Sequence, residues 1–460
     1  MNRKISIRKN LFSEIKIQKK LIHMVLIATK PDIIKQAPLI LELRRQREYV
    51  LIVHSGQHYD WNLSGGLEKE FNIIPDVNLN VQGVLYEQQS QIIERLGFIL
   101  SEVKKLNKFI IPYIYGDTTT ALAGGIASFA NLMGTAHVEA GLRTMSPPKE
   151  AILGLLDDFD VQDYFMELRQ SSRWAKGSYE PYPEQFDTRA AAPSAGVHFA
   201  PTRLNADHLL NEGYASERVY IVGNPVSDAL EYVEKRINKS DIFEKYPVLA
   251  KSEVIRFCVH RRENVSSFQR FGAIYEAMVD LVKEGRTILF ISLGATERAL
   301  EAYGLKEKIA RLAKRYKNFI YSPVWPFYTD VIAVMKKCLV VATDSGSIQE
   351  ETNMLGLPGV VLRFNSDRPE AIFAGSNILV PPIKKEIVAK IIREISDNKS
   401  LNKKMRETPK LYGEEVSKKM VRVIKKITKK DSFFNLFELV EHERLGLIKM
   451  PFWKKGETRW

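Results

Sequence analysis

The feature that most constrains the fold is a regular alternation, from residue 22 onward, between short apolar runs and longer segments with helical periodicity. The runs are rich in Val, Ile and Leu. Such runs separated by helices predict parallel sheets covered on both faces, because parallel strands need crossover helices. The expected strands are 22–28, 50–55, 109–115, 134–138, 197–200 and 218–222, then 254–259, 286–292, 318–322, 338–342, 358–362 and 377–380. The expected helices include 32–46, 86–106, 118–131, 202–213, 268–284, 296–316, 346–355 and 383–396.

Two series of about six strands are more than one sheet usually holds, so we predict an α/β protein with two doubly wound, Rossmann-like domains. The break falls near Gly223-Asn224-Pro225, which gives domains at 21–223 and 224–414. We expect a basic lead at 1–20 to be a flexible tail or an incorrectly assigned start. The other stretches outside the alternation are a segment at about 146–182, with a partly amphipathic helix and an acidic face, and an extension at 431–460.

The net charge of +13 is concentrated near the two ends of the chain. Residues 1–20 carry seven basic and one acidic residue, and residues 401–430 carry eleven basic and three acidic, which accounts for the whole excess. A nucleic-acid groove would spread basic side chains over a domain face, so we expect no nucleic-acid partner. No apolar run reaches the roughly 18 residues of a membrane span, and no secretory signal is present. Two cysteines in apolar runs, Cys258 and Cys338, fit a cytoplasmic protein without a zinc site.

Charged residues follow the expected strands of the first half, at the edge where open parallel sheets bind ligands. Lys30 follows the first strand, where a phosphate would lie. Asp117 stands at a helix entrance and alone fits a helix N-cap equally well. Glu139 and Arg143 follow another strand and either face one crevice or form a structural ion pair.

The second half supplies cations and a helix N-terminus at the corresponding edge. Strand 254–259 runs into His260, Arg261 and Arg262, which predicts an anion site. The small residues Ser345, Gly346 and Ser347 open a helix, Glu351 lies one turn further on, and Arg368 follows a later strand. There is no GxGxxG after the first strand and no P-loop. Carboxylates from one half and an anion grip from the other suit a sugar diphosphate held between two domains.

Ten blocks, in this order, resemble the UDP-N-acetylglucosamine 2-epimerase family. They are TKPDIIKQAP, SGQHYD, YGDTTTALAG, HVEAGLRT, PEQFDTR, HFAPT, VGNPVSDAL, HRREN, DSGSIQEE and LRFNSDRPEAIFAG, with a weaker match at PKLYGEEVSKKM. GDTTTA, HVEAGLR and HRREN together are very specific, whereas any one block alone is weak.

The resemblance implies the two-domain fold of nucleotide-sugar glycosyltransferases (GT-B-like), with a last helix at about 415–430 crossing back to the first domain. It implies interconversion of UDP-N-acetylglucosamine and UDP-N-acetylmannosamine through elimination and re-addition of UDP, with no cofactor and no metal consumed. By position, the acid/base carboxylates are Asp117, Glu139 and Glu184, and His260 assists the departing phosphate. The substrate-binding positions are Lys30, Arg143, Arg261, Ser345, Gly346, Ser347, Glu351 and Arg368. Gln57 and His58 match a regulatory site of bacterial relatives.

The chain departs from the family pattern at several of these positions. ATKPD replaces the usual GTRPE, so Lys30 supplies a point charge in place of a bidentate fork. The PEExNR motif reads PEQFDT, with Arg189 displaced by one, and Ser347 replaces a glycine. About 35 extra residues separate Arg143 from Pro183. We expect this insertion to emerge at the rim of the cleft and to pack elsewhere or make a dimer contact, in preference to acting as a lid.

Three rival hypotheses accompany the non-hydrolysing epimerase. A hydrolysing 2-epimerase would release UDP and free N-acetylmannosamine, and only water access distinguishes it. A glycosyltransferase would need an acceptor and usually one base, whereas Asp117 and Glu139 form a pair. A catalytically dead sensor is disfavoured because all three carboxylates and His260 are present. For partners we expect a UDP-sugar substrate and a homodimer.

Overall fold

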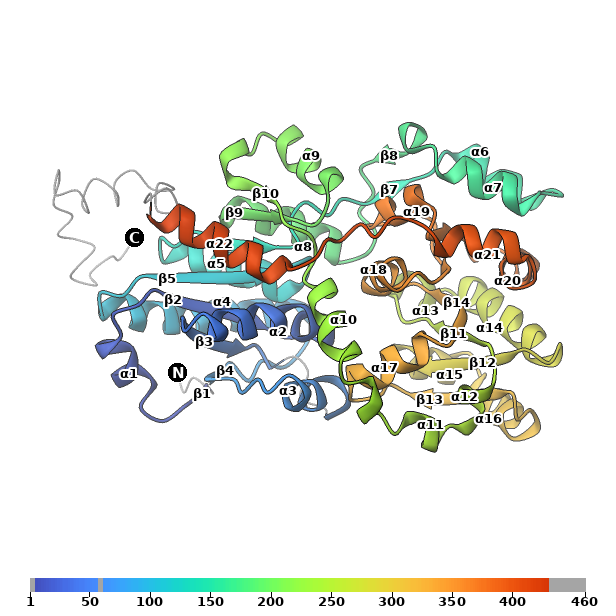
Figure 1. Cartoon of the computed structure of the whole chain (residues 1–460), viewed down its shortest axis with the longest axis horizontal. Helices are drawn as coiled ribbons and strands as arrows, with labels where there is room; N and C mark the ends of the chain where they lie inside the picture. The colour runs from blue at the N-terminus through green and yellow to red at the C-terminus, as the bar shows by residue number, and fades with distance from the viewer. Residues whose placement is uncertain (1–4, 57–60, 430–460) are drawn as a thin grey trace.

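The computed structural model of the protein describes residues 5–56 and 61–429 and places two sheet-and-helix domains side by side (Figure 1). The first sheet has the order β1-β4-β3-β2-β5-β6-β9-β10. Its strands are parallel except where β1 pairs with β4. The strands are β1 (Ser6–Ile7), β2 (Ile22–Ile27), β3 (Tyr49–His54), β4 (Val77–Asn78), β5 (Ile110–Tyr115), β6 (Thr135–Val138), β9 (Ala195–Ala200) and β10 (Val219–Ile221).

Helices cover this sheet because each crossover between parallel strands returns over one of its faces. They are α1 (Leu11–Ile17), α2 (Lys30–Arg45), α3 (Gly66–Glu70), α4 (Leu85–Lys105), α5 (Thr119–Ala130), α8 (Glu184–Ala191) and α9 (Arg203–Asn211). Residues 5–20 are not a flexible tail, which corrects the prediction for this part of the lead. They form β1 and α1, and the side chains of Leu11 and Ile15 are buried in an apolar cluster with β2 and α4.

The second domain is built on a six-stranded parallel sheet with the order β13-β12-β11-β14-β15-β16. Its strands are β11 (Val254–Cys258), β12 (Thr287–Ser292), β13 (Phe319–Pro323), β14 (Cys338–Thr343), β15 (Gly359–Val361) and β16 (Asn377–Leu379). Its helices include α14 (Phe268–Lys283), α15 (Gly294–Ala302), α16 (Lys306–Arg315), α17 (Tyr328–Met335), α18 (Gly346–Leu355), α19 (Pro369–Ala374), α20 (Lys385–Asp397) and α21 (Lys399–Arg406). The single helix expected at 296–316 is two helices, because Gly304 adopts a φ of 65° between them.

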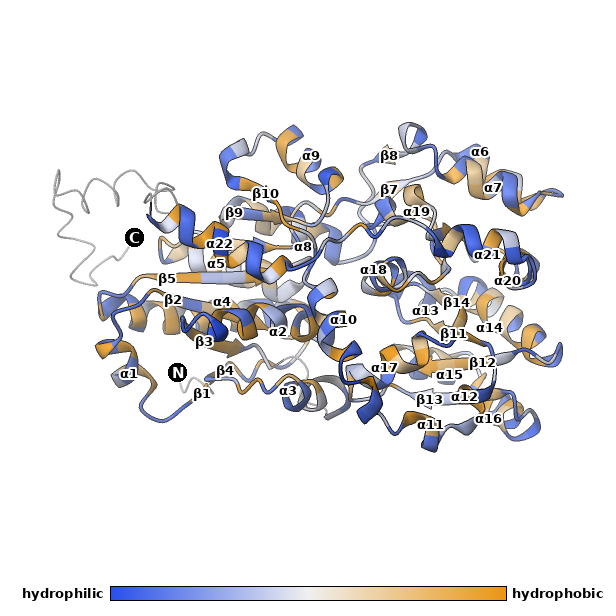
Figure 2. Cartoon of the chain, in the orientation of Figure 1, coloured by the Kyte–Doolittle hydropathy of each residue, from blue (hydrophilic) through white to orange (hydrophobic). Residues whose placement is uncertain are grey.

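Two helices join the domains. Helix α10 (Val226–Glu234) packs against α2 on one side and against α17 and α18 on the other. Helix α22 (Val416–Lys429) returns from the second domain and packs on α2 (Figure 1). Its apolar residues form one stripe, visible as alternating orange and blue in Figure 2, and this stripe joins an apolar cluster that includes both domains. The expected GT-B-like architecture with a returning last helix is therefore confirmed.

The inserted segment (residues 146–182) leaves the first domain but packs on the second. Its base is a short antiparallel pair of β7 (Met145–Ser146) and β8 (Ala175–Lys176), and α6 (Lys149–Leu153) and α7 (Val161–Leu168) lie between them. In Figure 1 these helices lie beside α19, α20 and α21. The acidic amphipathic helix expected here is broken by a turn of 3-10 helix at Gly154–Leu156. No helix in the described part of the chain is long and apolar enough to span a membrane, and the 431–460 extension lies outside the described residues.

Candidate active site between the domains

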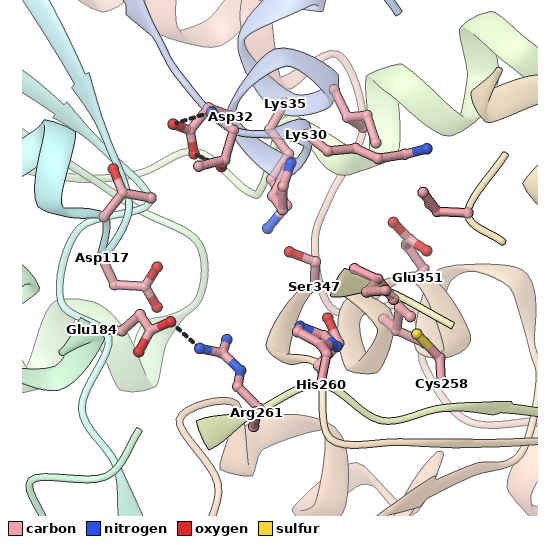
Figure 3. A pocket seen from close by; sticks show the side chains of 18 of the residues that line it. Lys30, Asp32, Lys35, Asp117, Glu184, Cys258, His260, Arg261, Ser347 and Glu351 are labelled. Atoms are coloured by element: carbon pink, nitrogen blue, oxygen red, sulfur yellow. Dashed lines mark hydrogen bonds and ion pairs between the residues drawn. The ribbon is translucent and has the colours of Figure 1, made fainter. Parts of the chain in front are cut away.

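A cavity of about 510 Å³ lies between the two domains, and side chains from both of them line it. The first domain contributes the segments after β2 and β5 and the start of α8, and the second contributes the segments after β11, β12 and β14. These are the carboxyl ends of parallel strands, where open sheets bind ligands. Figure 3 shows Asp117, Glu184 and Arg261 at one side of the cavity and Lys30 and Glu351 at the other.

The N-terminus of α2 presents Lys30 to the cavity. Thr29 closes a capping box with Asp32, since its backbone N–H and its hydroxyl both donate to that carboxylate, at 3.2 and 3.0 Å. The Nζ of Lys30 donates across the cleft to the carbonyl oxygen of Trp325 at 2.5 Å. Burial lowers the pKa of Lys30 to about 8. The amine of Lys30 is therefore mostly protonated at neutral pH and can bind an anion or a carbonyl oxygen of a ligand.

Glu139 is the centre of a buried ion network beneath the cavity. Its Oε1 accepts hydrogen bonds from Lys35 Nζ and from Asn224 Nδ2, both at 2.7 Å, and Arg368 Nη2 lies 3.4 Å away. Lys35 also bonds Glu350 on α18, and Arg368 Nε donates to Glu350 at 3.0 Å. Glu139 holds a φ of 61°, which few residues other than glycine adopt, so the turn after β6 is strained. The network joins α2 of the first domain to α18 of the second.

The pKa values of the two carboxyls of this network are shifted in opposite directions. Burial disfavours the charged form of Glu139, but Lys35 and Arg368 outweigh it and hold the pKa of Glu139 well below its ordinary range. Burial and the nearby Glu139 raise the pKa of Glu350 well above its ordinary value. The opposite shifts follow because two adjacent buried carboxyls do not both ionise readily, and the two cations stabilise the charge on Glu139.

Asp117 and Glu184 are the predicted acid/base carboxyls that line the cavity. Asp117 follows β5 and accepts from Arg368 Nη1 at 3.0 Å. Glu184 is the first residue of α8 and forms an ion pair with Arg261 of the second domain (Figure 3). Burial raises the pKa of Glu184 although Arg261 opposes the shift. Burial also raises the pKa of Asp187, one turn further along α8, to about 7.

The turn after β11 is organised by Asp344, which the sequence did not single out. Its carboxylate accepts from the backbone N–H groups of His260 and Arg261, at 2.9 to 3.1 Å, and from Asn264 Nδ2 at 3.1 Å. The Nδ1 of His260 lies 3.4 Å from Asp344 Oδ1. Burial lowers the pKa of His260 despite this carboxylate, so the imidazole is neutral at pH 7. A neutral imidazole next to a guanidinium can donate one hydrogen bond to an incoming phosphate oxygen.

The N-terminus of α18 completes the wall. Ser345 and Ser347 line the cavity, and free N–H groups at a helix start favour an anion. Gly346 lies beneath them against Arg368, and a Cβ there would stand 2.9 Å from Arg368 Nη1. Glu351, one turn along, lines the other end of the cavity, and burial raises its pKa.

Comparisons with known proteins identify the family of the chain. A family model described as UDP-N-acetylglucosamine 2-epimerase matches residues 41–152 and 176–425. The UDP-N-acetylglucosamine 2-epimerase of Escherichia coli K12 is 31% identical over 386 residues, which cover 81% of this chain and 90% of that protein. The chain belongs to this family of isomerases.

Solved structures of the same family superimpose on the chain. The Methanocaldococcus jannaschii UDP-GlcNAc 2-epimerase in complex with UDP-GlcNAc and UDP is 26% identical, with a TM-score of 0.73, over 88% of this chain and 99% of that one. The Neisseria meningitidis enzyme bound to UDP-GlcNAc is 26% identical, with a TM-score of 0.72, over 88% and 100%. The family model leaves residues 153–175 unmatched, which lie within the inserted segment.

The fold brings most, but not all, of the predicted site residues of this epimerase family member together. Arg143 does not line the cavity, because its guanidinium forms two hydrogen bonds to Glu212, at 2.6 and 2.7 Å. Glu139 also lies below the lining, whereas Gln57 and His58 fall outside the described residues. The described residues contain no group of three His, Cys, Asp or Glu side chains placed to hold a metal ion.

Sequence reasoning missed Lys35 and Arg256. Lys35 lies five residues after Lys30, in the N-terminal half of α2 and within the block TKPDIIKQAP. Its side chain is buried in the structure. Arg256 interrupts the apolar run of β11. A guanidinium in a buried strand needs a hydrogen-bond or ion-pair partner, because burial of an unpaired charge is unfavourable. Its Nη1 is buried without a hydrogen-bond partner, and the side chain lines the cavity.

Proposed function

We propose that this protein interconverts UDP-N-acetylglucosamine and UDP-N-acetylmannosamine without releasing free sugar. The observation that carries the proposal is a single cavity with two carboxyls, Asp117 and Glu184, on one wall and an anion grip on the other. The grip consists of Arg261, His260 and the start of α18. The bound UDP-GlcNAc and UDP in the related structures support a UDP-sugar as the ligand.

The chemistry assigned to the carboxyls follows from their positions. One carboxylate removes the proton at C2 of the sugar, the C1–O bond breaks, and its electron pair leaves with UDP. Re-addition of UDP and return of a proton on the opposite face gives the epimer. Glu184 suits proton transfer near neutral pH because burial raises its pKa. Asp117 is the second of the predicted acid/base carboxyls that line the cavity.

Glu139 receives a different role from the one expected from the sequence. Its Oε1 is occupied by Lys35 and Asn224, and its side chain does not line the cavity. We therefore assign Glu139 to holding Lys35 and Arg368 in place beneath the substrate. Removal of Glu139 would act on the reaction through these two cations.

The diphosphate is held by the second domain. Ser345 and Ser347 at the start of α18, Arg261 and His260 line the same cavity, and the start of a helix favours an anion. A diphosphate that binds Arg261 competes with Glu184 for the same guanidinium. Substrate binding thus frees the Glu184 carboxyl for proton transfer and retains UDP after the C1–O bond breaks.

The test is incubation of the protein with UDP-N-acetylglucosamine in D₂O without an acceptor. We expect deuterium at C2 and a mixture of the two UDP-sugars. Accumulation of UDP and free N-acetylmannosamine would establish the hydrolysing reaction instead, and absence of deuterium would favour a glycosyltransferase.

Replacement of the two cavity carboxyls tests their roles. Glu184→Gln and Asp117→Asn should each lower turnover by about 10²- to 10⁴-fold, the range of positioned acid/base groups, while UDP still binds. Glu217→Gln, an exposed position in the same domain, is the matched control and should leave turnover unchanged. A fully active Glu184→Gln protein would mean that another group moves the proton.

We also propose that the protein forms a homodimer. The side chains of Ile126 and Phe129 on α5 are 44% and 52% exposed, which supports an apolar contact surface on the first domain. Light scattering should give twice the chain mass of 52.6 kDa. A mass of one chain at micromolar concentration would exclude the dimer.

A further inference from the structure

The inserted segment (residues 146–182) is anchored to the second domain along its whole length. Tyr164 donates its hydroxyl to the carbonyl of Leu379 at 2.9 Å, and the rings of Trp174 and Phe373 meet edge to face at 5.2 Å. Eight apolar side chains of residues 145–174 belong to the core cluster of the second domain: Met145, Ala151, Leu155, Val161, Tyr164, Phe165, Leu168 and Trp174. A free surface flap would not bury its apolar face in this way.

Both ends of the segment also form hydrogen bonds with the second domain. At the start, Met145 and Ser366 exchange two backbone hydrogen bonds, at 2.9 and 3.0 Å. At the end, Asn365 Nδ2 donates to Glu180 at 2.9 Å, and the backbone N–H of Tyr182 donates to Glu263 at 2.8 Å. The segment therefore starts and ends in the first domain but is held by the second.

The C-terminal end of the segment lies next to Glu184, which connects this anchoring to the proposed chemistry. Tyr182, Pro183 and Glu184 are consecutive and all line the cavity. Glu184 meets Arg261 only while its loop stays against the second domain, because Arg261 follows β11 of that domain. Every contact that fixes residues 180–182 thus limits how far the Glu184 carboxyl can move from the anion grip.

We propose that the inserted segment is an interdomain strap that positions Glu184 and holds the cleft closed around its ligand. This inference rests on the proposed function for its effect on turnover, but its effect on the cleft is independent of it. Tyr164 and Trp174 are positioning residues in this account, since they touch the second domain and do not line the cavity.

The hairpin base allows the strap to be removed cleanly. Ser146 and Ala175 are paired across β7 and β8, so residues 147–174 can be replaced by an Asn-Gly turn, which favours two-residue hairpins. The family model has no match for residues 153–175, which include most of the deleted residues, and this supports folding of the shortened chain. A second variant, Trp174→Ala, keeps the chain length, and Gln162→Ala, an exposed position on α7, is its control.

Hydrogen–deuterium exchange of residues 178–190 and steady-state kinetics test the strap. We expect exchange in this region to rise about 10-fold or more in the deletion and Trp174→Ala proteins. We expect kcat to fall about 10- to 100-fold, since small displacements of a catalytic group have effects of this size, while the Kd for UDP changes less than about twofold. Gln162→Ala should match the wild type in all three measurements.

Two outcomes would overturn the proposal. Unchanged exchange at residues 178–190 in Trp174→Ala, or in a folded deletion protein, would mean that the segment does not hold the loop. A loss of UDP affinity equal to the loss of kcat would indicate a general disturbance of the second domain. If the wild type itself shows no exchange at C2 of the sugar, the proposed function fails, whereas the hydrogen–deuterium comparison still decides on the strap.

Discussion

Replacement of Lys35 by methionine tests the buried network that joins the domains. Lys35 is 1% exposed, and its Nζ binds Glu139 at 2.7 Å and also bonds Glu350. Removing one partner of a buried ion pair costs about 3–5 kcal/mol, because a buried charge loses its counter-ion. At roughly 2–4 °C per kcal/mol for a domain of this size, the melting temperature should fall by about 10 °C at pH 7.

The pH dependence of this loss has a definite sign. The pKa of Glu139 is depressed in the folded protein, so its contribution to stability is present above its ordinary value of 4.5 and is lost as the pH falls through its folded value. The pKa of Lys35 is raised above 10.5, so its contribution is present below that value and is lost at higher pH. The difference between wild type and Lys35→Met should therefore be largest from about pH 5 to 9 and shrink on acidification below it.

Glu350→Gln is the matched control for this prediction. Burial and the nearby Glu139 raise the pKa of Glu350 well above its ordinary value, which favours its neutral form, and an amide of the same shape mimics that form. We expect a change of less than about 1 kcal/mol. Thermal unfolding followed by circular dichroism at pH 4, 7 and 9 gives the comparison. Equal losses in Lys35→Met and Glu350→Gln, or a Lys35→Met loss that is the same at pH 4 and pH 7, would refute this assignment of charge.

Three further replacements have separate readouts. Arg256→Leu should raise the melting temperature, because it removes a buried guanidinium nitrogen that has no hydrogen-bond partner. It should also weaken UDP binding about 10-fold, because a ligand contact is lost. Thermal unfolding with and without UDP measures both effects. Gly346→Ala should displace Arg368, whose Nη1 would lie 2.9 Å from the new Cβ, and lower kcat about 10-fold or more in the sugar assay while the protein stays folded. Burial raises the pKa of Asp187 to about 7, so the stability that its protonated form contributes is lost as the pH rises from about 4 to 7. The Asp187→Asn protein should therefore melt at a higher temperature than the wild type at pH 8 but not at pH 4.

The fold could be predicted from the sequence because its strands are buried on both faces. The runs at 22–28, 254–259 and 338–342 match β2, β11 and β14 to within one residue, since an apolar run between helical segments leaves few alternatives. The lead was harder to interpret. Leu11 and Ile15 are buried and Ile5 and Phe12 pack beside them, on a part of the first domain that local periodicity does not reveal.

The inserted segment shows a different limit of sequence analysis. Its amphipathic pattern predicts that Tyr164 and Leu168 are buried but does not identify the surface that covers them. Part of that surface lies more than 200 residues further along the chain, where the carbonyl of Leu379 accepts from the Tyr164 hydroxyl. The pairing is a tertiary contact between domains, so no local rule specifies it.

The candidate site could be located from strand ends, but its charge state could not. Carboxylates on one wall and cations on the other were expected, and the structure interlocks them: Asp117 and Glu139 of the first domain share Arg368 of the second. Separation of the domains would leave Glu139 with Lys35 but without Arg368 and Glu350. The ionisation of the site is therefore a property of the closed pair of domains. A segment that holds the two domains together, as we propose for the inserted segment, would also preserve the ion pairs between Arg368 and the carboxylates of the first domain.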